Sequence, residues 1–139
     1  MSPAGNQMPE PQSQRPPTIL LVEDDVLLRL SVCDHLREAG FTVHEAASGD
    51  EAKAILNAGV VIDLVFSDVQ MPGQTDGVAL AAWTRSNFPD VLIALTSGAP
   101  AGLEQAARGK TEAIIPKPYD HDALVGRFQA LLAARPAPS

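Results

Sequence analysis

Apolar residues in this chain follow two patterns, short continuous runs and longer segments in which they recur every three to four positions. The continuous runs predict β-strands at residues 18–22, 41–46, 62–68, 91–97 and 112–116. The periodic segments begin at capping residues or end near glycine or proline, and they predict helices at residues 25–39, 48–59, 78–88, 100–109 and 120–134. The predicted order is therefore a strand followed by a helix, repeated along the whole folded part.

Strands that are separated by helices run parallel, with right-handed crossovers that place helices on both faces of the sheet. This order predicts an α/β fold, a flavodoxin-like (βα)5 doubly wound parallel sheet with strand order 2-1-3-4-5. Ligands of such sheets bind at the carboxyl ends of the strands, near the point where the strand order reverses. Chemically active residues are therefore expected at those ends.

Polar residues do gather at the predicted strand ends. Strands one, three, four and five end at, or are followed by, Glu23 and Asp24, Asp68, Thr96 and Ser97, and Lys117. Strand two ends in Glu45, with nothing reactive after it. The acids Glu23, Asp24 and Asp25 are consecutive, and crowded like charges repel. Asp25 is explained as a helix N-cap, whereas Glu23 and Asp24 indicate a cation site.

Composition narrows the class of protein. Residues 1–17 contain five prolines and no apolar periodicity, which predicts a disordered tail before a single domain at 18–134, and residues 135–139 form a short flexible tail. The net charge of −7 disfavours non-specific binding to nucleic acid or to anionic membranes. No apolar run is long enough for a membrane span, so a cytoplasmic protein is expected. The single cysteine, Cys33, is expected to be an inert core thiol.

Four motifs then resemble one known family. In chain order they are VEDD at 22–25, SDVQMPGQTDG at 67–77, LTSG at 95–98 and PKPY at 116–119. Together they resemble the receiver domain of bacterial two-component response regulators, over about residues 17–134. The resemblance implies a domain that takes a phosphoryl group from a phosphohistidine and signals by doing so.

The resemblance implies a Mg²⁺ site. Asp24 and Asp68 correspond to direct ligands, Glu23 completes the acidic pair, and the backbone carbonyl of Gln70 is a further ligand. Mg²⁺ prefers oxygen ligands and is usually held by one or two carboxylates, which agrees with the residues present. The cation would also relieve the repulsion between the acids.

The resemblance also assigns the phosphoryl chemistry. Asp68 corresponds to the phosphoacceptor, Thr96 to the hydroxyl residue that contacts the phosphoryl group, and Lys117 to the lysine that pairs with it. The bond between Lys117 and Pro118 corresponds to a cis peptide. An aspartate can form a covalent acyl phosphate, while Mg²⁺ and a lysine neutralise the peripheral oxygens of the transition state.

Two positions depart from the family pattern. The switch residues would be Thr96 and, three positions before Lys117, Ile114, where the family often has an aromatic residue. The loop at 72–77 is one residue longer than the common M-P-x-x-D-G motif, and its glycines make the longer turn feasible. The conformational response to phosphorylation is therefore expected to differ in detail from the aromatic form of the switch.

The leading hypothesis is a stand-alone receiver, because no further domain follows residue 134 in the sequence. Its expected partners are a sensor histidine kinase or a histidine phosphotransfer protein and an unknown downstream protein, but no nucleic acid and no membrane. It would signal by phosphorylation-dependent partner binding or by onward phosphotransfer. It is expected to be a monomer or weak homodimer, and it would not be an enzyme with a separate substrate.

Three alternatives remain open. A pseudo-receiver would bind partners without phosphorylation, although the full set of motif residues argues against it. A Mg²⁺-dependent phosphohydrolase of the haloacid dehalogenase type needs a second acid two residues after its nucleophile, where this chain has Gln70. A flavodoxin-like FMN binder needs a phosphate loop rich in glycine and hydroxyl groups, where this chain has three acids.

The remaining conspicuous residues have structural explanations. Asp76 is expected to cap the third helix or its turn. The three histidines, His35, His44 and His121, share no metal-ligand spacing. Trp83 is expected to pack on the third helix or to lie partly exposed.

Overall fold

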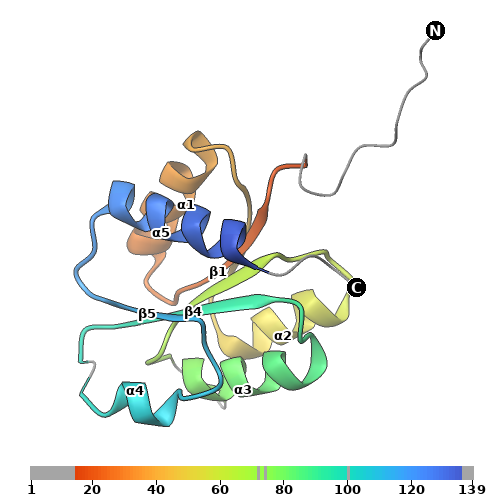
Figure 1. Cartoon of the computed structure of the whole chain (residues 1–139), viewed down its shortest axis with the longest axis vertical. Helices are drawn as coiled ribbons and strands as arrows, with labels where there is room; N and C mark the ends of the chain where they lie inside the picture. Colours follow the sequence, from red (N-terminus) through yellow and green to blue (C-terminus); the bar gives the residue numbers. More distant parts are fainter. Residues whose placement is uncertain (1–14, 72, 74, 100, 136–139) are drawn as a thin grey trace, which may run out of the picture.

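A computed structural model describes residues 15–135 of the chain apart from 72, 74 and 100. In these residues strands and helices alternate as predicted (Figure 1). The elements are β1 (Thr18–Val22), α1 (Val26–Glu38), β2 (Thr42–Ala46), α2 (Gly49–Asn57), β3 (Leu64–Asp68), α3 (Gly77–Asn87), β4 (Leu92–Ser97), α4 (Leu103–Ala106), β5 (Ala113–Pro116) and α5 (His121–Ala134).

The strands form one parallel sheet in the order β2-β1-β3-β4-β5, which confirms the predicted topology. Helices α1 and α5 lie on one face of the sheet, and α2, α3 and α4 lie on the other (Figure 1). Strand order therefore reverses between β1 and β3, whose carboxyl ends meet at one edge of the sheet.

Helix α4 is much shorter than predicted, with four residues in place of the expected span 100–109. Gly102 stands at its N-cap in the left-handed conformation, with φ of 77°, and provides no side-chain cap. Gly109 is also left-handed, with φ of 76°. The two glycines confine the helix between them, because the left-handed conformation interrupts α-helical geometry.

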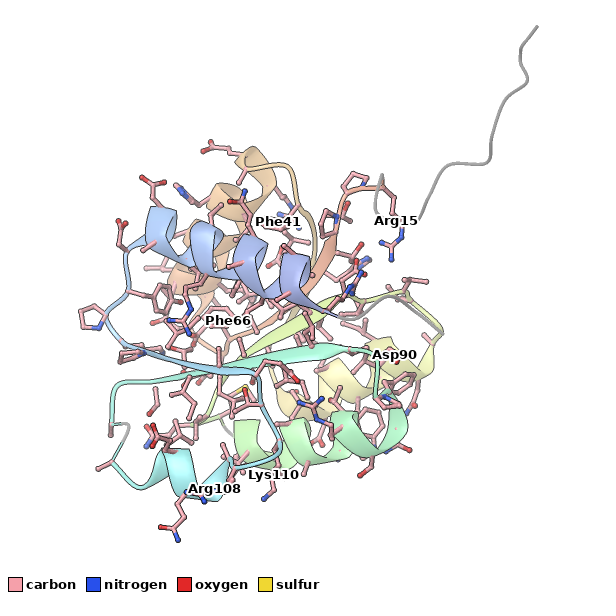
Figure 2. The ribbon with its side chains drawn as sticks, viewed as in Figure 1. Arg15, Phe41, Phe66, Asp90, Arg108 and Lys110 are labelled. Atoms are coloured by element: carbon pink, nitrogen blue, oxygen red, sulfur yellow. The ribbon has the colours of Figure 1, made fainter. Side chains whose placement is uncertain are left out.

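The core fills both faces of the sheet. Because successive strand residues point to opposite faces, Ile19 and Leu21 pack toward α1 and α5, while Leu20 and Val22 pack toward α2 and α3. Figure 2 shows Phe66 lying beneath α5, where its ring meets that of Phe128 edge-on at 5.0 Å between centroids. The carboxyl edge therefore rests on a rigid, closely packed base.

Several sequence assignments are confirmed in this core and at the helix ends. Cys33 is fully buried, and burial together with the nearby Glu45 charge raises the pKa of its thiol to about 11. The helix N-caps are as expected, with side-chain oxygens accepting hydrogen bonds from backbone N–H groups three residues later at Asp25, Ser48, Asp76 and Asp120. Trp83 is half-buried and packs against Phe88.

A buried carboxylate joins several segments at the opposite end of the sheet, where the strands begin. Asp63, just before β3, accepts two hydrogen bonds from Arg15, at 3.0 Å each, one from Arg135 at 2.9 Å and one from the Thr18 amide at 2.7 Å. Residues 15–17 and 135 were predicted to belong to the tails, so the ordered unit extends beyond the predicted bounds at both ends. The rest of those tails, residues 1–14 and 136–139, lies outside the described residues.

This contact sets the charge of Asp63. Burial alone would raise the pKa of its carboxyl, but the Thr18 amide and the two arginines outweigh burial and lower that pKa below its ordinary value.

Within the part of the chain that is described, no helix is long and apolar enough to cross a lipid bilayer.

We predict that Asp63→Asn lowers the free energy of unfolding at pH 7 by about 2 to 4 kcal/mol, because it removes a buried charge with several partners. Arg135→Ala should cost about 1 kcal/mol, since that arginine is partly solvated. The difference between wild type and Asp63→Asn should persist above the ordinary aspartate pKa and vanish as the pH falls through the lowered pKa of Asp63.

Urea unfolding between pH 3 and pH 7 measures these values. Arg127→Ala is the control, because Arg127 is exposed on α5, the helix that Arg135 directly follows. A pH-independent difference for Asp63→Asn would contradict the role assigned to this carboxylate.

Candidate functional site

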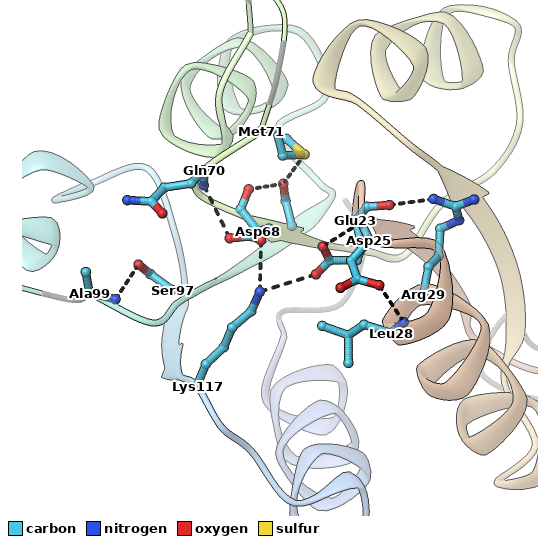
Figure 3. A network of polar contacts seen from close by, with 11 residues as sticks. Glu23, Asp25, Leu28, Arg29, Asp68, Gln70, Met71, Ser97, Ala99 and Lys117 are labelled. Carbon is cyan, nitrogen blue, oxygen red and sulfur yellow. Dashed lines mark hydrogen bonds and ion pairs between the residues drawn. The ribbon is translucent and has the colours of Figure 1, made fainter.

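The polar residues at the carboxyl edge come together as the sequence predicted. Asp68 is the last residue of β3 and pairs in register with Thr96 on β4. Glu23 and Lys117 follow directly on β1 and β5. Figure 3 shows the Lys117 side chain extending between Asp68 and Glu23. The site is thus built from the ends of four adjacent strands.

Three of these residues form an acidic cluster. Glu23, Asp24 and Asp68 each offer a carboxylate oxygen, and these oxygens lie within 4.8 Å of one another. Glu23 and Asp68 are buried, whereas Asp24 is exposed. An all-oxygen donor set open to solvent on one side suits Mg²⁺, which keeps several of its waters. Among the described residues, this is the one group of three or more potential metal ligands, and it includes no histidine.

Lys117 partly neutralises the cluster. Its Nζ lies 2.8 Å from Asp68 Oδ2 and 3.4 Å from Glu23 Oε1. Burial lowers the pKa of this ammonium, but the hydrogen bond and charge of Asp68, with the charge of Glu23, outweigh burial and raise the pKa above its ordinary value. The bond between Lys117 and Pro118 is cis, the geometry that the family resemblance implied.

Glu23 stays under electrostatic stress despite this partner. Burial raises the pKa of its carboxyl above the ordinary value, and the Asp25 amide and the Lys117 charge offset only part of that rise. The negative charge of Asp68 adds to it. A single lysine therefore does not balance the acids, and the site favours an additional cation.

Thr96 provides an unpaired hydroxyl beside Asp68. The residue is 1% exposed, and its Oγ1 has no hydrogen-bond partner among the described residues. Leaving a buried hydroxyl unpaired costs about 1 to 3 kcal/mol. An acceptor that arrives at Asp68, such as a phosphoryl oxygen, would give this hydroxyl a partner.

The loop after Asp68 is fastened at both ends. The Gln70 amide donates to Asp68 Oδ1 at 3.2 Å, and the Gly77 amide donates to the Val69 carbonyl at 2.8 Å. Thr75 ties the loop to α2 through a 2.7 Å hydrogen bond to Asp50. A Cβ at Gly77 would overlap the Asp68 carbonyl, so glycine is required there. Residues 72 and 74 of the longer loop lie outside the described residues.

The finer role assignments stay predictions. Gln70 lies beside Asp68, but the contact formed is through its amide, so the role of its carbonyl as a metal ligand remains an expectation. Ile114 is half-buried on β5, pairs in register with Leu95 and packs against the cluster that contains Leu103. Its position is compatible with a switch role, which also remains an expectation.

Sequence reasoning missed one residue of this site. Arg29 on α1 donates to the Glu23 carbonyl at 2.7 Å and to Glu45 at 3.2 Å (Figure 3 shows the first contact). Glu45 had no role assigned from the sequence. The pairing of β1 with β2, in which Glu45 lies beside Leu21, brings it within reach of Arg29. No local spacing rule relates Arg29 to Glu45, because the contact needs the β1–β2 pairing.

Comparison with known proteins agrees with this geometry. Residues 19–129 match the family model described as the response regulator receiver domain. A curated relative, the sensor kinase CckA of Brucella abortus, is 44% identical over 82 residues, which are 58% of this chain and 9% of that protein. The chain spans between 9% and 47% of the length of three such relatives.

Solved structures give the same result. A response regulator receiver protein from Sinorhizobium medicae is 34% identical with a TM-score of 0.78, and the match covers 87% of this chain and 98% of that one. The regulator TrrA from Thermotoga maritima, solved with Mg²⁺ and BeF, is 26% identical with a TM-score of 0.76, over 83% and 98% of the two chains.

We predict opposite effects of one substitution with and without Mg²⁺. Asp24→Asn removes one of the crowded charges, so it should raise the melting temperature of the metal-free protein slightly. The same variant should lose most of the stabilisation that wild type gains from millimolar Mg²⁺. Thermal melts with EDTA or with added Mg²⁺ measure both effects.

Asp25→Asn is the matched control, because it removes a neighbouring charge but keeps an equally good N-cap for α1. It should retain the response to Mg²⁺. The assignment of Asp24 to the cation site is wrong if both variants respond to Mg²⁺ as wild type does.

Proposed function

The chain belongs to the response regulator receiver domain family, and from this membership we propose that Asp68 accepts a phosphoryl group from a phosphohistidine in a Mg²⁺-dependent reaction. The observation that carries the proposal is the grouping around Asp68 of an acidic cluster, a charged lysine and an unpaired buried hydroxyl. Phosphoryl transfer needs positioning and charge neutralisation more than covalent chemistry, and this grouping supplies both.

In the proposed step an Asp68 carboxylate oxygen forms a bond to phosphorus while the P–N bond of the phosphohistidine breaks. The imidazole leaves with the electron pair of that bond, and Asp68 becomes an acyl phosphate. Mg²⁺, held by Asp24 and Asp68 with Glu23 nearby, would neutralise phosphoryl oxygens. Lys117, already 2.8 Å from Asp68, would move its hydrogen bond to a phosphoryl oxygen.

Thr96 would complete the contacts to the transferred group. Its buried Oγ1 has no hydrogen-bond partner in the part of the chain that the structure describes, and Thr96 pairs in register with Asp68 in the sheet. A hydroxyl that gains its partner as the phosphoryl group arrives stabilises both the transition state of transfer and the phosphorylated state. This gain would be the first event of the switch, with Ile114 on the next strand as the residue that responds to it.

The surface beside the site supports a protein donor. Three apolar side chains at the start of α1 are exposed, namely Val26 (55%), Leu27 (79%) and Leu30 (46%), and we refer to them as the α1 patch. They lie on the first turns of the helix that begins after Asp24 and Asp25, so a protein that presents a histidine to Asp68 would also cover them. A sensor kinase or a histidine phosphotransfer protein is the donor proposed.

The same proposal covers the output. The domain would pass the signal on by binding a protein partner when phosphorylated or by onward transfer, as a cytoplasmic stand-alone receiver without turnover of a separate substrate. Support extends to a receiver that folds as an independent domain, because Arg15 and Arg135 near the two ends of the described region both bind Asp63, and the match covers 98% of the Sinorhizobium medicae receiver chain. A phosphohydrolase is less well supported, because Val69 and Gln70 provide no second acid after Asp68.

We predict that Thr96→Val slows phosphorylation by phosphoramidate about 10- to 100-fold, the effect of one hydrogen bond to a charged group. Its stability should be unchanged or higher, because an unpaired buried hydroxyl is replaced by a methyl group. Phosphate-affinity gels and urea unfolding measure the two quantities.

Thr84→Val is the matched control, since Thr84 on α3 is also fully buried and its hydroxyl has no partner within residues 15–135, positions 72, 74 and 100 aside. It should keep the wild-type rate. Equal rates for Thr96→Val and wild type would remove Thr96 from the proposed reaction.

We also predict that Leu27→Asp slows transfer from a phosphorylated histidine kinase, identified by phosphotransfer profiling, at least about tenfold, because it places a charge in the apolar contact. The rate with acetyl phosphate should stay unchanged. Val61→Asp is the control, as Val61 is similarly exposed (63%) but lies before β3, away from the carboxyl edge. If Leu27→Asp slows both donors equally, the α1 patch is not a docking surface.

A further inference from the structure

We propose that Arg29 is a positioning residue that holds the β1–α1 turn, and with it Asp24, in the geometry needed to bind the cation. This inference rests on the proposed function, since it concerns the same cation site. Among the described residues, the Arg29 side chain hydrogen-bonds to the Glu23 carbonyl and to Glu45, and it makes no hydrogen bond to Asp68. It acts through the backbone of Glu23.

The Glu23 carbonyl lies where the sheet stops supplying partners. Strand β1 ends at Val22, and the Glu23 amide makes one last hydrogen bond to the Ala46 carbonyl on β2, at 3.0 Å. The Glu23 carbonyl accepts a hydrogen bond from Arg29 Nη1 at 2.7 Å. The Arg29 side chain is only 15% exposed, so this hydrogen bond is shielded from solvent.

Asp24 depends on this carbonyl. The Glu23 carbonyl and the Asp24 Cα belong to the same planar peptide unit, so the hydrogen bond to that carbonyl restrains ψ of Glu23 and φ of Asp24, on which the position of the Asp24 side chain depends. The Asp25 amide donates to Glu23 Oε2 at 3.1 Å, which closes the turn on its other side. Loss of the Arg29 contact would free this carbonyl to rotate toward water, and the accompanying change in the turn would shift the Asp24 carboxylate relative to Glu23 and Asp68.

The charge of Arg29 does not compete strongly with a bound cation, because Glu45 neutralises it. Arg29 Nε lies 3.2 Å from Glu45 Oε1, and the planar guanidinium reaches the Glu45 carboxylate and the Glu23 carbonyl together. A lysine has one point charge and cannot span both acceptors equally well. Arg29 therefore combines a fixed hydrogen bond with little added positive field at the cluster.

Helix α1 contains a matched arginine with the same contacts at another place. Arg37 donates to the Val43 carbonyl at 3.0 Å and lies 3.4 Å from Glu45 Oε2. Both arginines thus join α1 to β2 through Glu45 and one backbone carbonyl. They differ in that the carbonyl held by Arg37 belongs to the middle of β2 and not to the acidic turn.

The experiment compares Arg29→Gln, Arg29→Lys and Arg37→Gln by two readouts. Calorimetric titration with Mg²⁺ should show about tenfold weaker binding for Arg29→Gln, as is found when residues that orient metal ligands are replaced. Arg29→Lys should bind Mg²⁺ with an affinity between those of Arg29→Gln and wild type. Arg37→Gln should change the affinity by less than about twofold. Hydrogen exchange in the metal-free protein should show faster exchange of the Asp25 amide in Arg29→Gln alone.

The two readouts separate this inference from the proposed function. Neither depends on phosphorylation, so a protein that never accepts phosphoryl groups can still show the Arg29 effect. The inference is overturned if Arg29→Gln binds Mg²⁺ as wild type does, or if Arg37→Gln weakens binding to the same extent. If wild type binds no Mg²⁺, unchanged exchange of the Asp25 amide in folded Arg29→Gln overturns the inference, and faster exchange of that amide supports it.

Discussion

Repulsion among the carboxylates of Glu23, Asp24 and Asp68 is the constraint on which this structure depends. Their oxygens lie within 4.8 Å of one another because each residue stands at the end of a strand or within two residues after one, and the sheet is packed on both faces. The core cannot yield without losing buried apolar area, so the charges must be relieved at the site itself. Lys117 relieves part of the repulsion, and a divalent cation would relieve the rest.

Buried carboxylates at the amino ends and at the carboxyl ends of the strands have opposite pKa shifts. Asp63 accepts hydrogen bonds from two arginines and one amide, and the pKa of its carboxyl falls below the ordinary value. Glu23 has one lysine and one amide as partners, and the pKa of its carboxyl rises. Asp63, with enough hydrogen-bond donors, joins the two ends of the domain, whereas Glu23, with too few, lies where a cation can bind. Arg29 extends the difference, because it satisfies the backbone of the acidic turn but leaves the carboxylates free.

The sequence predicted the elements, because hydrophobic periodicity is a local property, and alternating strands and helices then indicated the sheet order and the edge at which the polar residues gather. It failed where a contact depended on pairing of distant segments, as between Arg29 and Glu45 or between Asp63 and Arg135. It also overestimated α4, whose apolar residues suit a helix longer than the glycines allow. The sequence also could not predict that the Thr96 hydroxyl has no hydrogen-bond partner among the described residues, because this depends on the positions of all the polar groups around it.

The most direct test of the central claim is intact-protein mass spectrometry after incubation with acetyl phosphate and Mg²⁺, followed by mapping of the modified residue. The account predicts one phosphoryl group on wild type, located on Asp68, no addition to Asp68→Asn, and none to wild type when EDTA removes the cation. Unmodified wild type in the presence of bound Mg²⁺ would contradict the account and favour a pseudo-receiver. A phosphoryl group on another residue would contradict the assignment of Asp68.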